Sequence, residues 1–176
     1  MSNQFVCILI VLSSLINFSF KEPKYCKLSD KILNEYSKEL KQQKEMILIG
    51  HGGAMMNDIQ EVCMHYISYD RLSVEEARKL YINLANGLLE KYNADEKIRP
   101  YLHNFPFSYN NLDIMIAFED KLSRRRLDDG SVALIFVAKD NLFYDGYDST
   151  TDKLYTLYKE PYAKAVEIVK QQSGIK

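Results

Sequence analysis

A single amphipathic segment, residues 73–93, constrains the fold of this chain more than any other part of its sequence. Its apolar side chains recur every three to four residues, as along one face of an α-helix: Val74, Ala77, Leu80, Tyr81, Leu84 and Leu88. Ser73 and Glu76 have the spacing of a capping box, in which a hydroxyl and a carboxylate each satisfy a free backbone N–H. We therefore predict a long helix, whose apolar face needs a partner surface from the rest of the chain.

Strand-like patterns on both sides of this helix supply that surface. Within residues 112–118, apolar side chains alternate with other residues, as in a strand with one buried face. Four other segments have the composition of strands: 46–50, 59–69, 131–138 and 142–147. Residues 153–159 are a candidate final strand. Because short turns join most of them, we expect an α+β domain with a mostly antiparallel sheet of about five strands.

Two further helices are predicted beside this sheet. Residues 29–45 carry a narrow apolar stripe, which favours a peripheral position over the domain. Pro161 is suited to the first position of a helix that runs to about residue 172. We expect the N-terminal helix, the long central helix and the C-terminal helix all to pack on the sheet.

An apolar segment precedes the domain. Residues 5–20 contain no charged side chain, and the lysine-rich stretch 21–27 follows at once. Such a run indicates either a signal peptide, with the best cleavage point after Ser19, or a retained membrane anchor. Asn17 is unfavourable for cleavage, and the run is shorter than the roughly 20 residues of a spanning helix. We predict a protein that is exported to the periplasm or cell envelope or membrane-anchored, with membrane contact through residues 5–20.

The remaining chain divides into a linker with the peripheral helix, residues 21–45, and a single α+β domain, residues 46–176. The formal net charge of the whole chain is −1. A nearly neutral chain lacks the broad positive surface on which nucleic-acid binding depends, so no nucleic-acid partner is expected.

Two cysteines lie outside the apolar segment, Cys26 and Cys63, and form a candidate disulfide in an oxidising compartment. A disulfide requires their Cα atoms to lie within about 7 Å, which sequence does not reveal. The alternative is a mobile Cys26 and a small buried Cys63.

Three blocks of this sequence are similar to parts of a known pattern. They are EEARKLYINLANGLLEKYNADEKIRPYLHNFPF, the preceding GHGGAMMNDIQEV and the closing YKEPYAKAVEIV. Together they span about residues 50–169, and they resemble an uncharacterised family of small exported bacterial proteins of unknown function. The resemblance implies one recurring domain behind an export signal, and it implies no functional residue.

Histidine, cysteine and aspartate residues suggest one chemical site. Cys63 and His65 are two positions apart and therefore share a face of a strand. Together with His51 and Asp58 they could supply the mixed ligands of a transition metal. Their spacing differs from paired zinc motifs, so no metal or cofactor is expected. A small metal-dependent hydrolase that uses His51, Asp58 and His65 remains the alternative function.

Four aromatic residues around Pro100 and Pro106 suggest a second site: Tyr101, Phe105, Phe107 and Tyr109. Such a loop either packs on the sheet or offers an apolar surface to a partner. Because no catalytic motif is present, we expect a binding or interaction domain rather than an enzyme. Its partner would be an unidentified protein or small ligand.

Overall fold

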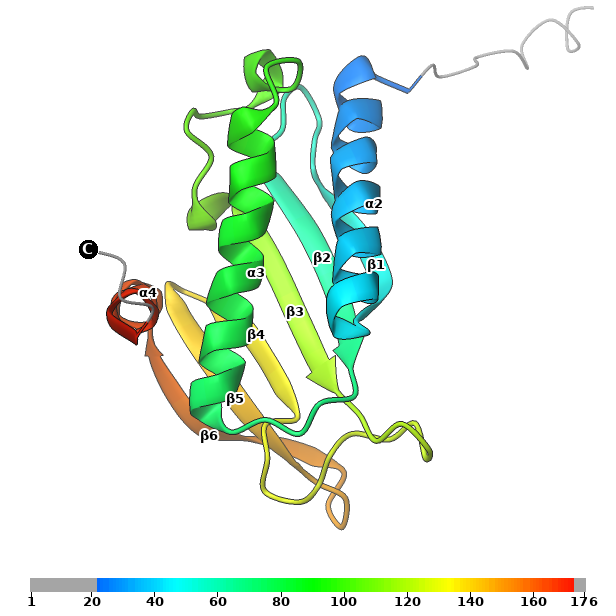
Figure 1. Cartoon of the computed structure of the whole chain (residues 1–176), viewed down its shortest axis with the longest axis vertical. Coiled ribbons are helices and arrows are strands. Elements are labelled where there is room, and N and C mark those ends of the chain that lie inside the picture. Colours follow the sequence, from blue (N-terminus) through cyan, green and yellow to red (C-terminus); the bar gives the residue numbers. More distant parts are fainter. Residues whose placement is uncertain (1–21, 173–176) are drawn as a thin grey trace, which may run out of the picture.

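The structure is a computed structural model, and it describes residues 22–172; the predicted targeting segment, residues 5–20, lies outside them. The elements follow one another along the chain as α2 (Lys24–Lys44), β1 (Ile47–Ala54), β2 (Glu61–Ser68), α3 (Val74–Ala94), η1 (Arg99–Tyr101), η2 (Tyr109–Asn111), β3 (Leu112–Phe118), β4 (Leu134–Ala138), β5 (Asn141–Asp148), β6 (Lys153–Pro161) and α4 (Tyr162–Gln172). The α+β class is confirmed, with three α-helices in the described residues and a mostly antiparallel sheet (Figure 1).

The sheet has six strands rather than about five. They lie in the order β1-β2-β3-β4-β5-β6. The candidate final strand, β6, is a full strand of nine residues that pairs with β5 along its whole length. Its alternation is weak in sequence because most of its side chains are exposed on both faces of the sheet.

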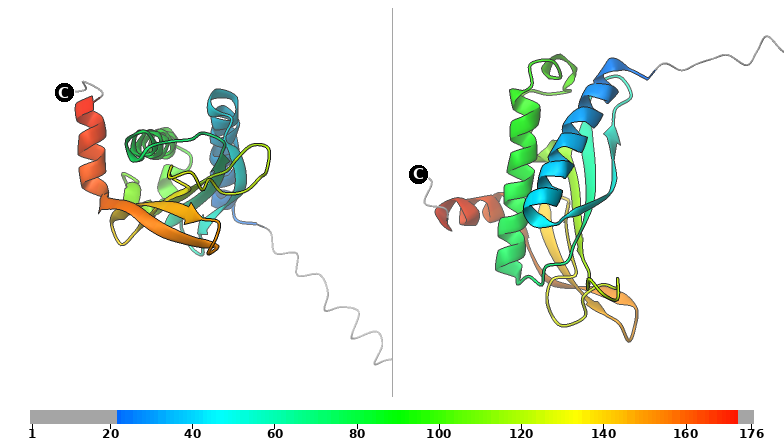
Figure 2. Two further views of the ribbon diagram at one scale, coloured as in Figure 1. Left: turned by 90° about the horizontal axis from the view of Figure 1, so that it is seen from below. Right: turned by 45° about the vertical axis from the view of Figure 1, so that its right-hand side comes forward.

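The only parallel strand pair in the described sheet is β2 with β3; every other neighbouring pair is antiparallel. Parallel strands need a crossover connection, and α3 provides it. The crossover returns the chain to the same end of the sheet, so β3 starts beside the start of β2. The helices α2 and α3 lie side by side on one face of the sheet (Figures 1 and 2).

The core lies between this helical layer and the sheet. Every second residue of β2 is buried on the helix side, including Val62, Met64 and Tyr66. The Tyr81 hydroxyl of α3 donates a hydrogen bond to the backbone oxygen of Ile114, 3.0 Å away in β3. The capping box predicted at the start of α3 is confirmed: Ser73 accepts from the Glu76 backbone N–H, and the Glu76 carboxylate accepts from Ser73.

The N-terminal helix differs from the prediction. It begins at Lys24, directly after Pro23, so most of the stretch predicted as a linker is helical. Its buried residues join the main core, among them Leu33, which is fully buried, and Tyr36. The helix is therefore an integral layer of the domain, because its narrow stripe fits between the sheet and α3.

Three element boundaries also differ from the prediction. The first strand was predicted over residues 46–50, but β1 continues through Gly52 and Gly53 to Ala54. The tight turn between β4 and β5 is made by Lys139 and Asp140, with φ of 49° and 60°. The strand β5 therefore begins at Asn141, one residue before the predicted segment 142–147. Pro161 ends β6 rather than opening α4, which begins at the next residue.

The opposite face of the sheet, called the outer face from here on, has no helix over it in the described part of the chain (Figure 2). Side chains of β2 and β3 that alternate with the core residues point to it, among them Cys63, His65, Asp113 and Met115. None of the helices within residues 22–172 is both long and apolar enough to cross a membrane.

Candidate metal centre

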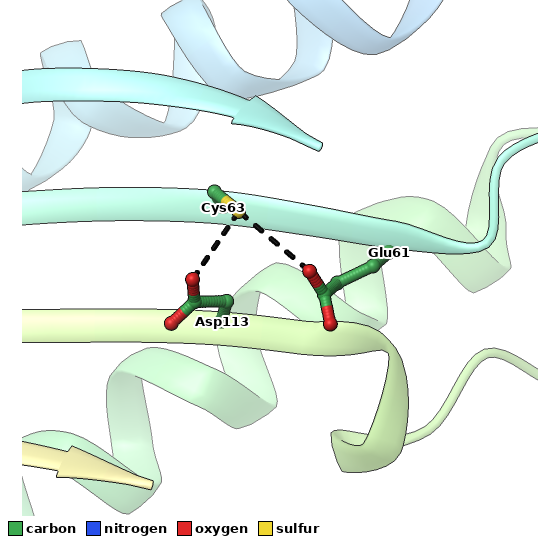
Figure 3. Close-up of side chains that lie close together, drawn as sticks. All are labelled: Glu61, Cys63 and Asp113. Carbon is green, nitrogen blue, oxygen red and sulfur yellow. Dashed lines mark hydrogen bonds between the residues drawn. The ribbon is translucent and has the colours of Figure 1, made fainter. Parts of the chain in front are cut away.

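Three potential metal ligands meet on the outer face where β2 and β3 run side by side. Glu61 and Cys63 are two positions apart on β2, so both side chains leave the same face. In the parallel register, Cys63 lies directly opposite Asp113 of β3. Figure 3 shows the three side chains converging, with the helices behind the strands. All three residues are half-buried.

The distances between the ligand atoms suit one metal ion. The Cys63 Sγ lies 3.4 Å from Asp113 Oδ2 and 3.8 Å from Glu61 Oε1. One ligand atom from each of the three residues lies within 4.8 Å of the other two. In a tetrahedral site with ordinary metal–sulfur and metal–oxygen bonds, neighbouring ligand atoms are about 3.4–3.6 Å apart. Small side-chain rotations would therefore complete the geometry.

Burial and the two carboxylates together control the ionisation of the Cys63 thiol. Burial, followed by the hydrogen bond and negative charge of Asp113 and then by Glu61, raises the pKa of Cys63 to about 12. Without a cation the thiol therefore keeps its proton at neutral pH and donates it to a carboxylate. A divalent cation would reverse this preference, because it attracts the thiolate and the carboxylates together.

His65 lies next to this cluster on the same face. Its Nε2 is 3.7 Å from Asp113 Oδ2, the oxygen that also faces the thiol. The group of three mutually close ligand atoms does not include His65. The histidine thus lies beside Asp113 but outside the ligand set, at a separation longer than a hydrogen bond.

The edge strand β1 leaves the other side of the cluster open. Gly52 pairs with Cys63, and Gly50 pairs with His65, so any side chain there would stand on the outer face. A Cβ atom added at either glycine would have no heavy atom within 4 Å. The space beside Cys63 and His65 is therefore free of side chains from β1, and Ala54 places only a methyl group opposite Glu61.

The structure does not bring together the three residues of the hydrolase alternative. His51 points to the helix side of β1, where its Nδ1 lies 3.8 Å from a carboxylate oxygen of Asp30 in α2. Asp58 pairs with His103 at 2.7 Å, and this hydrogen bond lowers the pKa of the Asp58 carboxyl group. His65 faces the outer side beside Asp113.

Sequence reasoning did place Cys63 and His65 on one face, but it missed Glu61 and Asp113. The sequence did contain a signal for Glu61, because Glu61 lies two residues before Cys63 and continues the same alternation. Asp113 is 50 residues away from Cys63, and only the pairing of β2 with β3 brings it close.

The aromatic loop residues mostly pack against the domain. Phe107 is buried and stacks on Tyr92, with ring centroids 5.4 Å apart. Tyr109 stacks on Tyr162 at 4.4 Å, and Tyr101 lies 5.7 Å from Tyr25. Phe105 alone of the four is largely exposed, at 53 %, with the Arg99 guanidinium over its ring. The loop thus exposes one aromatic ring, that of Phe105, to a binding partner.

The candidate disulfide is not formed, and both Cys26 and Cys63 are free. The sheet separates them: Cys26 belongs to α2 in the helical layer, whereas Cys63 faces the outer side. Cys63 is half-buried between carboxylates rather than packed among apolar side chains.

A thiolate with two carboxylates is a mixed donor set that suits borderline metals such as Zn²⁺ better than Mg²⁺ or Ca²⁺. The site consists of residues from two strands and needs no loop to form it. No protein-family model, no curated protein and no solved structure matches this chain.

Proposed function

We propose that this protein is a binding domain that holds one divalent transition-metal ion, of the Zn²⁺ class, on the outer face of its sheet. The ligands are Glu61, Cys63 and Asp113. The observation that carries the proposal is the parallel register that sets Cys63 opposite Asp113, with ligand atoms 3.4 Å apart.

The kind of ion follows from the donors. Hard cations such as Ca²⁺ take six to eight oxygen ligands, and this cluster offers two carboxylates beside a sulfur. A thiolate ligand favours zinc-like ions, which accept sulfur and oxygen in one tetrahedral site. The raised pKa of Cys63 gives the binding a further property: the ion must displace the thiol proton, so affinity should increase with pH.

We also propose that the domain works outside the cytoplasm or at a membrane. The support is the uncharged run of residues 5–20 followed by lysines, together with the resemblance to small exported bacterial proteins. Binding rather than catalysis is favoured because His51, Asp58 and His65 have separate partners.

Cobalt titration tests the metal site. Full-length protein treated with a chelator is titrated with Co²⁺, and the thiolate-to-cobalt absorption band is followed. We expect one equivalent to bind, with Cys63→Ser abolishing the band and Asp113→Asn weakening affinity by about tenfold or more.

The controls lie outside the cluster. His51→Ala and Cys26→Ser should bind Co²⁺ as the wild type does, because neither residue belongs to the ligand set. A wild type that shows no thiolate band, or a Cys63→Ser variant with unchanged affinity, would contradict the proposal.

A further inference from the structure

We propose that the bound metal ion keeps its fourth coordination position for a ligand from outside the domain, a neutral nitrogen donor of the imidazole class. This inference rests on the proposed metal-binding function. Its support comes from the direction of the three ligands, the open space on β1 and the charge of the ligand set.

The first step concerns direction. Glu61, Cys63 and Asp113 all extend from the sheet toward the same side (Figure 3). Three ligands that approach a tetrahedral ion from below leave the fourth position pointing away from the sheet. No helix in the described part of the chain covers that side. Zinc sites with three protein ligands and a free position are the exchangeable kind, in contrast to closed structural sites.

The second step concerns access. Gly52 is the direct antiparallel partner of Cys63, and such partners carry their side chains about 4.5–5.5 Å apart on the same face. With glycine there, the approach along β1 is open, and neither Gly50 nor Gly52 has a neighbour within 4 Å of an added Cβ. Since β1 is an edge strand, a ligand can reach the ion from the side as well as from above.

The third step concerns charge. One thiolate and two carboxylates carry three negative charges, which exceed the two positive charges of the ion. A further anion would meet net repulsion at this site. A neutral imidazole nitrogen adds no charge and is a favoured ligand of zinc-like ions. The site therefore selects a neutral nitrogen donor over an anion such as azide.

The test uses the Co²⁺ form of the full-length protein, titrated separately with imidazole, azide and a blocked Gly-His-Gly peptide. We expect imidazole to change the visible cobalt bands with saturation, and azide to leave them unchanged at the same concentrations. A peptide that binds more tightly than imidazole would identify a protein side chain as the source of the donor. Equal affinities for the peptide and for imidazole would identify a small molecule as the source of the donor.

Gly52→Val is the decisive variant, because its methyl groups would fill the space beside Cys63. Imidazole affinity should fall at least tenfold while Co²⁺ affinity stays that of the wild type. His51→Val is the matched control: it adds a branched residue to the same strand on the opposite face, and both affinities should be retained.

Three results would overturn this inference alone. Azide binding as strong as imidazole would contradict the charge argument. If imidazole changed the cobalt bands of the His65→Ala variant but not those of the wild type, His65 would be the ligand in the fourth position. If Co²⁺ bound but imidazole changed its bands in neither the wild type nor His65→Ala, the site would be closed. The proposed function would still stand. Failure to bind Co²⁺ at all would instead overturn the proposed function, and this inference with it.

Discussion

The chemistry of Cys63 depends on which residues flank it rather than on its own position in the strand. Its sulfur has a carboxylate oxygen 3.4 Å away on β3 and another 3.8 Å away on β2. Partial burial is the main factor that raises the pKa of the thiol, and the two carboxylates add to it through hydrogen bonds and negative charge. The same arrangement that keeps the thiol protonated without a metal would stabilise the thiolate as a ligand once a cation is present.

Alkylation of Cys63 tests this environment. Because its pKa is about 12, the metal-free protein should react slowly with iodoacetamide at pH 8, and the rate should continue to rise with pH above 9. Asp113→Asn removes a negative charge and should accelerate the reaction several-fold at pH 8. Mass spectrometry of the labelled peptide measures the rate.

A Cys7→Ser/Cys26→Ser background restricts the labelling to Cys63. Asp140→Asn provides a control that removes a charge from an exposed turn elsewhere. A rate in the wild type equal to that of an unfolded peptide would contradict the placement of the thiol between the carboxylates.

At the scale of the helices and strands, the contact between α2 and α3 depends on a glycine. The Tyr36 hydroxyl of α2 donates to the Leu84 backbone oxygen of α3 at 2.7 Å. A Cβ added at Gly87 would lie 2.6 Å from that hydroxyl oxygen and 3.3 Å from the ring. The glycine thus permits the close approach of the two helices over the sheet, against its own low helix propensity.

Gly87→Ala should therefore destabilise the protein. Helix propensity alone predicts a gain of about 1 kcal/mol, but overpacking against the buried Tyr36 typically costs about 1–3 kcal/mol. We expect a net decrease in the free energy of unfolding, measured by urea denaturation. In a Tyr36→Phe background the same substitution should cost less, because the nearest atom is gone.

The neighbouring Asn86 supplies the matched control, since it is exposed on the same helix. Asn86→Ala should leave stability unchanged or raise it slightly. A Gly87→Ala protein more stable than the wild type would show that α2 does not press on α3 at this point.

At the scale of the whole molecule, a buried ion pair connects the central helix to the last strand. Arg78 of α3 donates from its Nε to Glu160 Oε1 of β6 at 2.6 Å, and the two side chains are 10 % and 1 % exposed. The Tyr144 hydroxyl of β5 donates to the same oxygen at 2.7 Å. The pair joins residues 82 positions apart and so depends on the completed fold.

Arg78→Met should lower the free energy of unfolding by about 3–5 kcal/mol, because it leaves the Glu160 carboxylate buried without its cation. The double variant Arg78→Met/Glu160→Leu should regain much of that loss, since a well-packed apolar pair avoids the desolvation of two charges. Guanidinium denaturation of both proteins measures the difference.

Lys79→Met, at the exposed next position of α3, is the control and should have little effect. A double variant no more stable than Arg78→Met would contradict an electrostatic origin and indicate a packing requirement instead.

Local patterns determined the elements of this fold. The capping box of Ser73 and Glu76 and the apolar repeat behind it predicted α3 nearly to its ends, and alternation predicted β3 over residues 112–118. Both are interactions between residues a few positions apart, which sequence displays directly. By the same rule, Cys63 and His65 were placed on one face.

Tertiary structure decided which of these elements meet. His51 and His65, both on neighbouring strands, face opposite sides of the sheet, and Asp58 turns to His103 instead. Asp113 joins Cys63 only because the α3 crossover lays β3 parallel to β2 in one register. Strand order and register depend on contacts across 50 residues, where no local periodicity carries information. The sequence by itself thus determined the donors on each strand, and the fold alone assembled them into a site.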